Sequence, residues 1–123
     1  MSCLFNSLSY FIDENSCQIR QKICDYLQSN LPIIDGIETS RVLELEHDSA
    51  FNYINSMRST STWGGAIEIQ SACNIWKICV NVRNDRDHCA KIIQFIPINN
   101  QYDRTIDIYW TGGHYEPIKH TAI

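Results

Sequence analysis

Residues 106–118 read Ile-Asp-Ile-Tyr-Trp-Thr-Gly-Gly-His-Tyr-Glu-Pro-Ile, and this stretch decides how the rest of the chain is arranged. Apolar and polar side chains alternate over residues 106–110, which is the period of a half-buried strand. Two glycines then free the backbone directly before His114. The sequence therefore predicts a strand that ends by aiming an imidazole at a fixed point.

The histidine has a carboxylate at a useful spacing. His114 and Glu116 are two residues apart, so both side chains leave the same face if the strand resumes after the turn. A histidine oriented by a carboxylate supplies two of the three members of a catalytic triad that activates a nucleophile. Cys3 is the best-placed candidate for the third member. The competing interpretation is that His114 is an ordinary histidine at a strand edge.

Length and composition limit the remaining possibilities. A chain of 123 residues is expected to form one domain, residues 1–123, around a single core. The net charge of −4 and the scattered basic residues argue against nucleic acid as a partner. No apolar stretch approaches the roughly 18 residues that a membrane span needs, so no membrane association is expected.

The cysteines point to reduced thiols. There are six of them and no secretion signal precedes them, which favours a cytosol-like compartment. A zinc site built from Cys73, Cys79, His88 and Cys89 would lack the paired Cys-x-x-Cys spacing, so no metal is expected.

The N-terminal residues have the pattern of a buried helix. Leu4, Leu8 and Phe11 share one helical stripe, which predicts a helix beginning at or just before Cys3. The positive end of a helix dipole favours a thiolate, so this is where a thiol nucleophile would be built. The alternative is that Cys3 is an inert residue on a frayed end.

The rest of the chain has helices first and strands afterwards, which is an α+β layout. Helical periodicity predicts further helices over residues 17–29, over 49–57, and from a cap at Thr62 or one of the following glycines to Trp76, with a partly helical surface segment at 38–48. Apolar alternation predicts strands at residues 77–82, 92–96 and 106–110, joined as an antiparallel meander.

Three motifs, Cys3-Leu4-Phe5, Thr62-Trp63-Gly64-Gly65 with Glu68 inside the following helix, and Gly113-His114-Tyr115, occur in this order across almost the whole chain. Together they resemble the ovarian tumour (OTU) family of cysteine deubiquitinases, and the short length resembles the compact members encoded by viruses. The resemblance implies an OTU-like cysteine protease fold, with N-terminal helices packed on a small, mostly antiparallel C-terminal sheet. A monomer in the cytoplasm is expected, and this would be the host cytoplasm if the chain is viral.

By this resemblance Cys3 falls on the nucleophile and His114 on the general base. Glu116 falls where the family usually has Asp or Asn to orient the ring, and glutamate is one methylene longer. The substrate-binding positions of the family fall on Trp63, Gly64, Gly65, Gly113 and Tyr115.

The resemblance is weakest at the start of the chain. The usual family motif is Asp-Gly-Asn-Cys, and here Met1 and Ser2 take the Gly and Asn places before Cys3. The backbone donors of the oxyanion hole would be Ser2 and Cys3. The expectation is either a longer native chain or a weakened oxyanion hole, and losing one such donor typically slows an enzyme by about 10²–10³.

The implied activity is hydrolysis of the isopeptide bond after the C-terminal Gly-Gly of ubiquitin or a ubiquitin-like protein, with no metal or organic cofactor. The arginine-rich ubiquitin tail is expected to pair with Glu44, Glu46 and Asp48. Two alternatives remain: a catalytically impaired OTU-like module that binds ubiquitin or polyubiquitin, and an interaction domain with this fold but no ubiquitin function.

Overall fold

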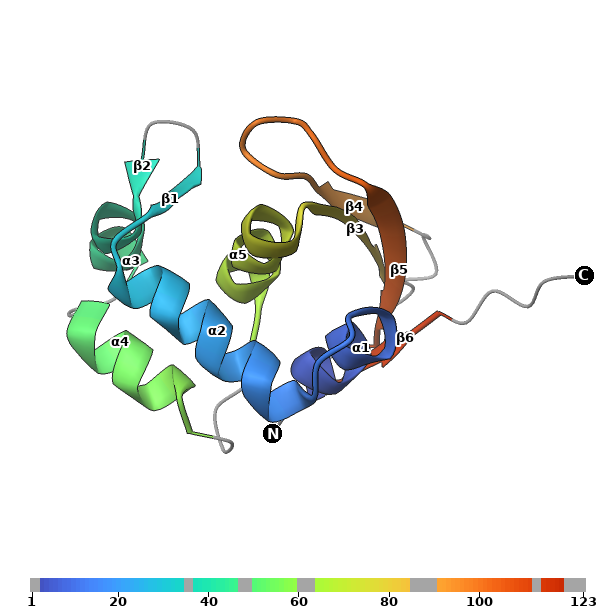
Figure 1. Cartoon of the computed structure of the whole chain (residues 1–123), viewed down its shortest axis with the longest axis horizontal. Coiled ribbons are helices and arrows are strands. Elements are labelled where there is room, and N and C mark those ends of the chain that lie inside the picture. Colours follow the sequence, from blue (N-terminus) through green and yellow to red (C-terminus); the bar gives the residue numbers. More distant parts are fainter. Residues whose placement is uncertain are drawn as a thin grey trace, which may run out of the picture.

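The computed structural model describes residues 3–34, 37–46, 50–59, 64–84, 91–111 and 114–118. Helices precede the main sheet along the chain, as the sequence predicts (Figure 1). In chain order the elements are α1 (Cys3–Phe11), α2 (Ser16–Gln28), β1 (Pro32–Ile34), β2 (Ile37–Glu38), α3 (Thr39–Glu46), α4 (Ala50–Met57), α5 (Ala66–Trp76), β3 (Ile78–Asn84), β4 (Lys91–Phe95), β5 (Arg104–Trp110) and β6 (Tyr115–Pro117).

The predicted helices are confirmed, each by burial of its apolar stripe. The first helix starts at Cys3 and buries Leu4 and Leu8. The second helix is preceded by a capping box, in which the Asn15 side chain accepts from the backbone N–H of Gln18 at 2.8 Å and the Gln18 side chain accepts from the backbone N–H of Asn15 at 3.1 Å. The short hairpin β1–β2 was not predicted, because strands of three and two residues are too short to show alternation.

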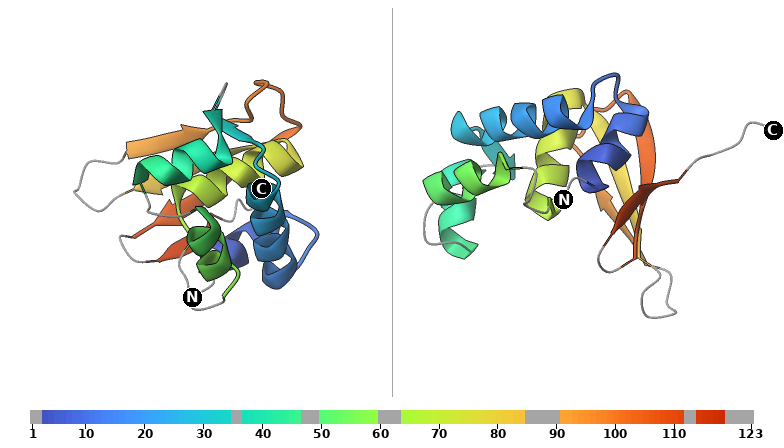
Figure 2. Two further views of the ribbon diagram at one scale, coloured as in Figure 1. Left: turned by 90° about the vertical axis from the view of Figure 1, so that its left-hand side faces the viewer. Right: turned by 90° about the horizontal axis from the view of Figure 1, so that it is seen from below.

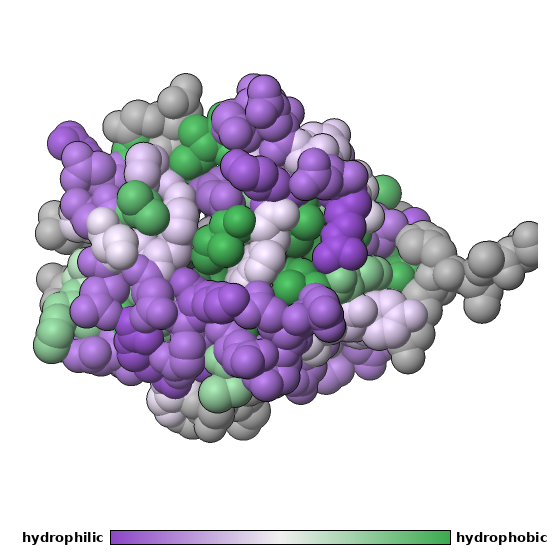
Figure 3. Space-filling model, viewed as in Figure 1, coloured by the Kyte–Doolittle hydropathy of each residue, from purple (hydrophilic) through white to green (hydrophobic). Residues whose placement is uncertain are grey.

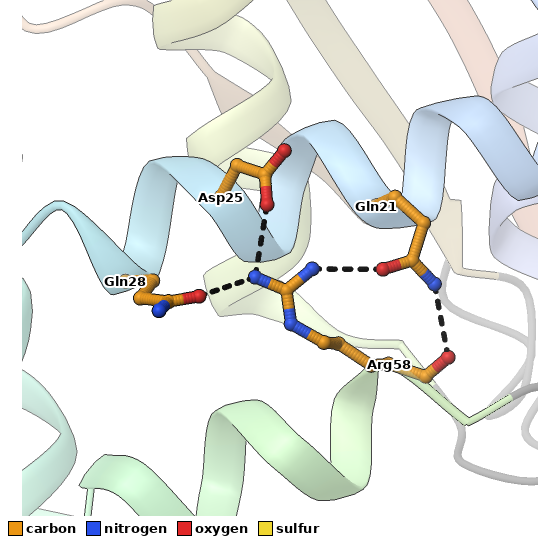
Figure 4. Close-up of polar contacts among 4 residues, drawn as sticks. All are labelled: Gln21, Asp25, Gln28 and Arg58. Carbon is orange, nitrogen blue, oxygen red and sulfur yellow. Dashed lines mark hydrogen bonds and ion pairs between the residues drawn. The ribbon is translucent and has the colours of Figure 1, made fainter.

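Arg58 fastens the end of α4 to α2 (Figure 4). Its guanidinium donates to Gln21 Oε1 at 2.8 Å, to Asp25 Oδ1 at 2.9 Å and to Gln28 Oε1 at 2.5 Å, and its backbone carbonyl accepts from Gln21 Nε2 at 3.1 Å. The three acceptors lie on one face of α2 because of their i, i+4, i+7 spacing. These hydrogen bonds therefore hold the C-terminal end of α4 against α2.

The main sheet has the strand order β4-β3-β5-β6, so the predicted meander is wrong. β3 pairs antiparallel with β4 but parallel with β5, and β5 pairs antiparallel with β6. The physical reason is the long connection over residues 96–103. It passes the start of β3, where the backbone N–H of Asp103 donates to the carbonyl of Lys77 at 2.9 Å, and delivers β5 to the opposite side of β3 from β4.

The helices lie on one face of this sheet, as the view from below shows (Figure 2). α5 packs on β3, and the core between them includes Ile69, Ala72, Val80 and Ile108, all of them buried. On the face seen in Figure 1, apolar residues gather at the centre, over α5, with hydrophilic residues around them (Figure 3). Within the described residues, no helix has the length and apolar character needed to span a membrane.

Candidate active site

The first and last elements of the chain meet at the candidate site. Cys3 is the first residue of α1 and is partly exposed. α1 packs against β6, which begins one residue after His114 (Figure 1). Burial raises the pKa of the Tyr115 phenol, and negative charge on Cys3 adds to that rise. The thiol and the strand after His114 are therefore neighbours.

His114 and Glu116 make the contact that their spacing predicts. His114 Nε2 lies 3.4 Å from Glu116 Oε1, and the side chains are 53% and 61% exposed. The turn before them is closed by the backbone N–H of Thr111, which donates to the His114 carbonyl at 3.0 Å. An exposed ion pair of this length is weak, so the strand and the turn set the position of the ring more than the carboxylate does.

The two glycines before α5 occupy different surroundings. A Cβ on Gly64 would stand 2.7 Å from Leu4 Cδ2 and 3.1 Å from the ring of Phe5, so close contact with α1 requires glycine there. Among the described residues, the nearest atom to a Cβ on Gly65 would be Glu68 Oε1 at 4.0 Å. Gly64 is thus accounted for by packing against α1, while Gly65 is not crowded by any described side chain.

Gly65 is the N-cap of α5, which is one of the caps that the sequence predicts. Its backbone N–H donates to the carboxylate of Glu68, the third residue of the helix, at 2.8 Å. The spacing of these two residues is the signal for such a cap. The other oxygen of Glu68 accepts from the Tyr53 hydroxyl at 2.6 Å, a contact that no sequence pattern indicated.

An apolar pocket of about 180 Å³ lies between α5 and the sheet, next to the site. The sequence did not predict it, because it forms where β3, β4 and β5 curve past α5. Ile93, at its rim, is 52% exposed. Its other walls include Ala66, Ile69, Phe95, Trp110 and Tyr115.

Several predicted site residues lie outside the described residues, namely Ser2, Asp48, Trp63 and Gly113. Glu44 and Glu46 belong to α3, and their side chains are also outside the described part. Cys73 and Cys79 of the discounted zinc set are buried free thiols, while His88 and Cys89 are not described. Among the residues that are described, no three His, Cys, Asp or Glu side chains cluster as metal ligands would.

Comparison with known proteins gives one consistent result. The sequence profile of the OTU-like cysteine protease family matches residues 2–119. Over 133 residues the chain is 26% identical to ubiquitin thioesterase otu2 of Schizosaccharomyces pombe, and the match covers 95% of this chain but only 42% of that protein.

Solved structures agree on the fold. An OTU domain in complex with ubiquitin matches with a TM-score of 0.73 and 24% identity, over 94% of this chain and 62% of that one. The viral OTU domain protease of Dera Ghazi Khan virus matches with a TM-score of 0.71 and 17% identity, over 94% of this chain and 72% of that one. The predicted OTU-like α+β fold is confirmed.

Proposed function

Because the chain belongs to the OTU-like cysteine protease family, we propose that it is a cysteine deubiquitinase that cleaves after the C-terminal Gly-Gly of ubiquitin or a ubiquitin-like protein. The observation that carries this proposal is the packing of α1, which begins at Cys3, against the strand that follows His114. The similar yeast protein is a ubiquitin thioesterase, and the similar OTU domain was solved with ubiquitin, which supports ubiquitin as the modifier.

In the proposed mechanism His114 takes the proton of the Cys3 thiol. The thiolate attacks the carbonyl carbon of the terminal glycine, and the C–N bond to the lysine breaks as His114 returns the proton to the departing amine. This leaves a thioester between Cys3 and the modifier. His114 then takes a proton from water, and the hydroxide attacks the carbonyl carbon of the thioester. The C–S bond breaks as His114 returns the proton to the Cys3 sulfur, and the new carboxyl group of the modifier loses its proton to solvent.

Glu116 has an orienting role in this scheme. Its Oε1 contacts His114 Nε2, which leaves Nδ1 of the ring to exchange the proton with the thiol. The backbone N–H groups of Ser2 and Cys3 are proposed to bind the oxyanion of the tetrahedral intermediates.

The substrate tail is proposed to run past Gly65 and Tyr115, with an apolar side chain of the tail entering the pocket of about 180 Å³. Trp63, Gly64 and Gly113 remain family-based assignments, and the acidic residues Glu44, Glu46 and Asp48 remain proposed partners of basic residues in the tail. The cysteines of the described residues are free thiols, which supports the proposal of a reducing, cytoplasmic compartment.

The test is a reaction of the chain with ubiquitin that carries a thiol-reactive electrophile at its C-terminus, followed by intact mass measurement. We expect one adduct, which disappears in Cys3→Ala and forms slowly in His114→Ala. Cys17→Ala is the matched control, because Cys17 is an exposed thiol on α2 and its loss should change nothing. An adduct that persists in Cys3→Ala contradicts the proposal, and ubiquitin binding with no adduct would favour the binding module instead.

A further inference from the structure

A buried carboxylate that the proposed mechanism does not use lies close to the candidate site. Glu68 is 1% exposed and accepts hydrogen bonds from the Gly65 backbone and the Tyr53 hydroxyl. Burial raises its pKa, and the bonds from Tyr53 and Gly65, together with the positive charge of Arg20, oppose that rise. A buried carboxyl group is retained in such a place only with specific hydrogen-bond partners, so its position is well defined.

A second buried ionisable side chain, Arg20, contacts the same helix α4 as Glu68. Arg20 is also 1% exposed, and its guanidinium carbon lies 4.2 Å from the centroid of the Phe5 ring. It donates to the Met57 carbonyl at 2.7 Å. The stacked ring and the carbonyl hold the guanidinium between α1 and the end of α4, because a cation is attracted to the face of an aromatic ring.

Both buried side chains act on the first turn of α1. Arg20 contacts Phe5, two residues after Cys3. Gly64 lies so close to Leu4 and Phe5 that an added Cβ would stand 2.7 Å from Leu4 Cδ2, and the neighbouring Gly65 is bound by Glu68. The first turn of α1 therefore contacts both the segment that Glu68 binds and the guanidinium of Arg20.

The phenol of Tyr115 relates Glu68 to the strand that follows His114. Burial has the largest effect in raising the pKa of Tyr115, and negative charges on Cys3 and on Glu68 both add to it. Tyr115 is thus within electrostatic reach of both groups.

We propose that Glu68 and Arg20 are positioning residues, which fix the first turn of α1 through Gly65 and Phe5 and so hold the Cys3 thiol opposite His114. The inference rests on the proposed function, because it assigns the thiol the role of nucleophile. Neither charge touches the reacting atoms.

The test uses Glu68→Ala, Glu68→Gln and Tyr53→Phe, with Glu38→Gln as the matched control. Glu38 is an exposed carboxylate with a hydrogen bond from Asn30 Nδ2 at 2.9 Å, so its change removes a charge far from α1. The first readout needs no ubiquitin: it is the ratio of iodoacetamide labelling at Cys3 to that at the exposed Cys17, measured by peptide mass spectrometry. The second is kcat and KM, measured separately on ubiquitin with a fluorogenic C-terminal amide.

We expect Glu68→Ala to lower kcat by about tenfold or more, with KM within about twofold, because a displaced thiol loses transition-state stabilisation and not binding. Its labelling ratio should fall towards that of His114→Ala. Glu68→Gln keeps an acceptor for the Gly65 N–H, so its kcat and its labelling ratio should lie between those of Glu68→Ala and the wild type. Glu38→Gln should match the wild type in both readouts.

Folded Glu68 variants with the wild-type ratio and the wild-type kcat would overturn the proposal. If Glu68→Ala does not fold, Tyr53→Phe decides, since it removes one hydrogen bond and should lower kcat and the labelling ratio by about two- to fivefold. A labelling ratio that depends on Glu68 in a chain that does not process ubiquitin would support the positioning role and count against the proposed function alone.

Discussion

The two sides of the candidate site are held in opposite ways. On the thiol side, the first turn of α1 packs against Gly64, and the buried Glu68 and Arg20 fix the groups around it. On the base side, His114 and Glu116 are both more than half exposed at the edge of the sheet. The position of Cys3 therefore depends on the core, whereas the position of His114 depends on one short strand and a turn.

The largest expected effect lies on the base side and leaves stability unchanged. His114→Ala should lower kcat/KM on a ubiquitin substrate by about 10²–10⁴-fold, because general acid–base catalysis is lost. The midpoint of chemical denaturation should stay at the wild-type value, since the side chain is exposed. A variant that keeps more than a tenth of the wild-type activity, or that unfolds at a lower denaturant concentration, would contradict this prediction.

On the thiol side, activity and stability should fall together. Gly64→Ala should lower the free energy of unfolding by about 1–3 kcal/mol, because its Cβ would overlap Leu4 Cδ2, and the rate should drop as α1 shifts. Gly65→Ala is the matched control. The free energy of unfolding of this variant should fall by less than about 1 kcal/mol, because alanine is a poorer N-cap residue than glycine. Urea denaturation of both variants measures the difference, and equal losses would contradict the packing argument.

Gly65→Ala also tests the proposed path of the substrate tail. If the tail passes beside Gly65, the added methyl group should raise KM for ubiquitin while the protein stays close to wild-type stability. An unchanged KM would remove Gly65 from the path and leave it only as the cap of α5.

A smaller effect is expected for the orienting carboxylate. Glu116→Gln should lower kcat by less than about tenfold, because an exposed ion pair contributes about 0.2–1 kcal/mol. High salt screens such a pair, so the wild type should approach the variant as salt is added. Steady-state rates at low and high ionic strength check this, and a loss as large as that of His114→Ala would show that the ring depends on Glu116 after all.

The smallest expected effect is the pH dependence of stability that Glu68 contributes. Its pKa is raised in the folded chain by burial, so the folded state holds the proton more tightly than the unfolded state. The stability of the wild type relative to Glu68→Gln should be greatest at acidic pH and fall as the pH rises through the raised pKa.

Glu14 provides the control of opposite sign for that measurement. Its hydrogen bond with Lys22 lowers its pKa, so the wild type should lose stability relative to Glu14→Gln as the pH falls. Denaturation series that run from acidic pH, below the ordinary glutamate pKa, up to neutral pH compare the wild type with each variant. If the stability difference between the wild type and each variant changed with pH in the same direction for Glu68 and Glu14, the raised pKa of Glu68 would be contradicted.

The sequence was sufficient to predict the helices, because each buries a stripe of apolar residues that repeats at helical spacing. The strand order could not be read in the same way. Alternation in β3 and β5 shows which face of each strand is buried, but it does not show that they pair parallel with each other. That pairing depends on the path of residues 96–103, whose sequence has no periodic pattern.

The same limit applies to the candidate site: contacts between residues close in sequence could be predicted, and contacts between distant residues could not. The contact of His114 with Glu116 and the cap of Glu68 on Gly65 follow from local spacing. The bond from Tyr53 to Glu68 joins residues 15 positions apart and needs α4 and α5 to be placed first. Sequence patterns therefore indicated the candidate residues Cys3, His114 and Glu116, but not the buried contact of Tyr53 with Glu68.

The meeting of α1 with β6 also sets the order in which the site can be assembled. A ribosome releases Cys3 first and His114 more than a hundred residues later, so the thiol emerges long before its base. β6 pairs with β5 at the edge of the sheet, so the site also needs these two C-terminal strands to be in place. Until His114 has been synthesised and β6 has reached α1, the growing chain holds the Cys3 thiol without the base proposed for it.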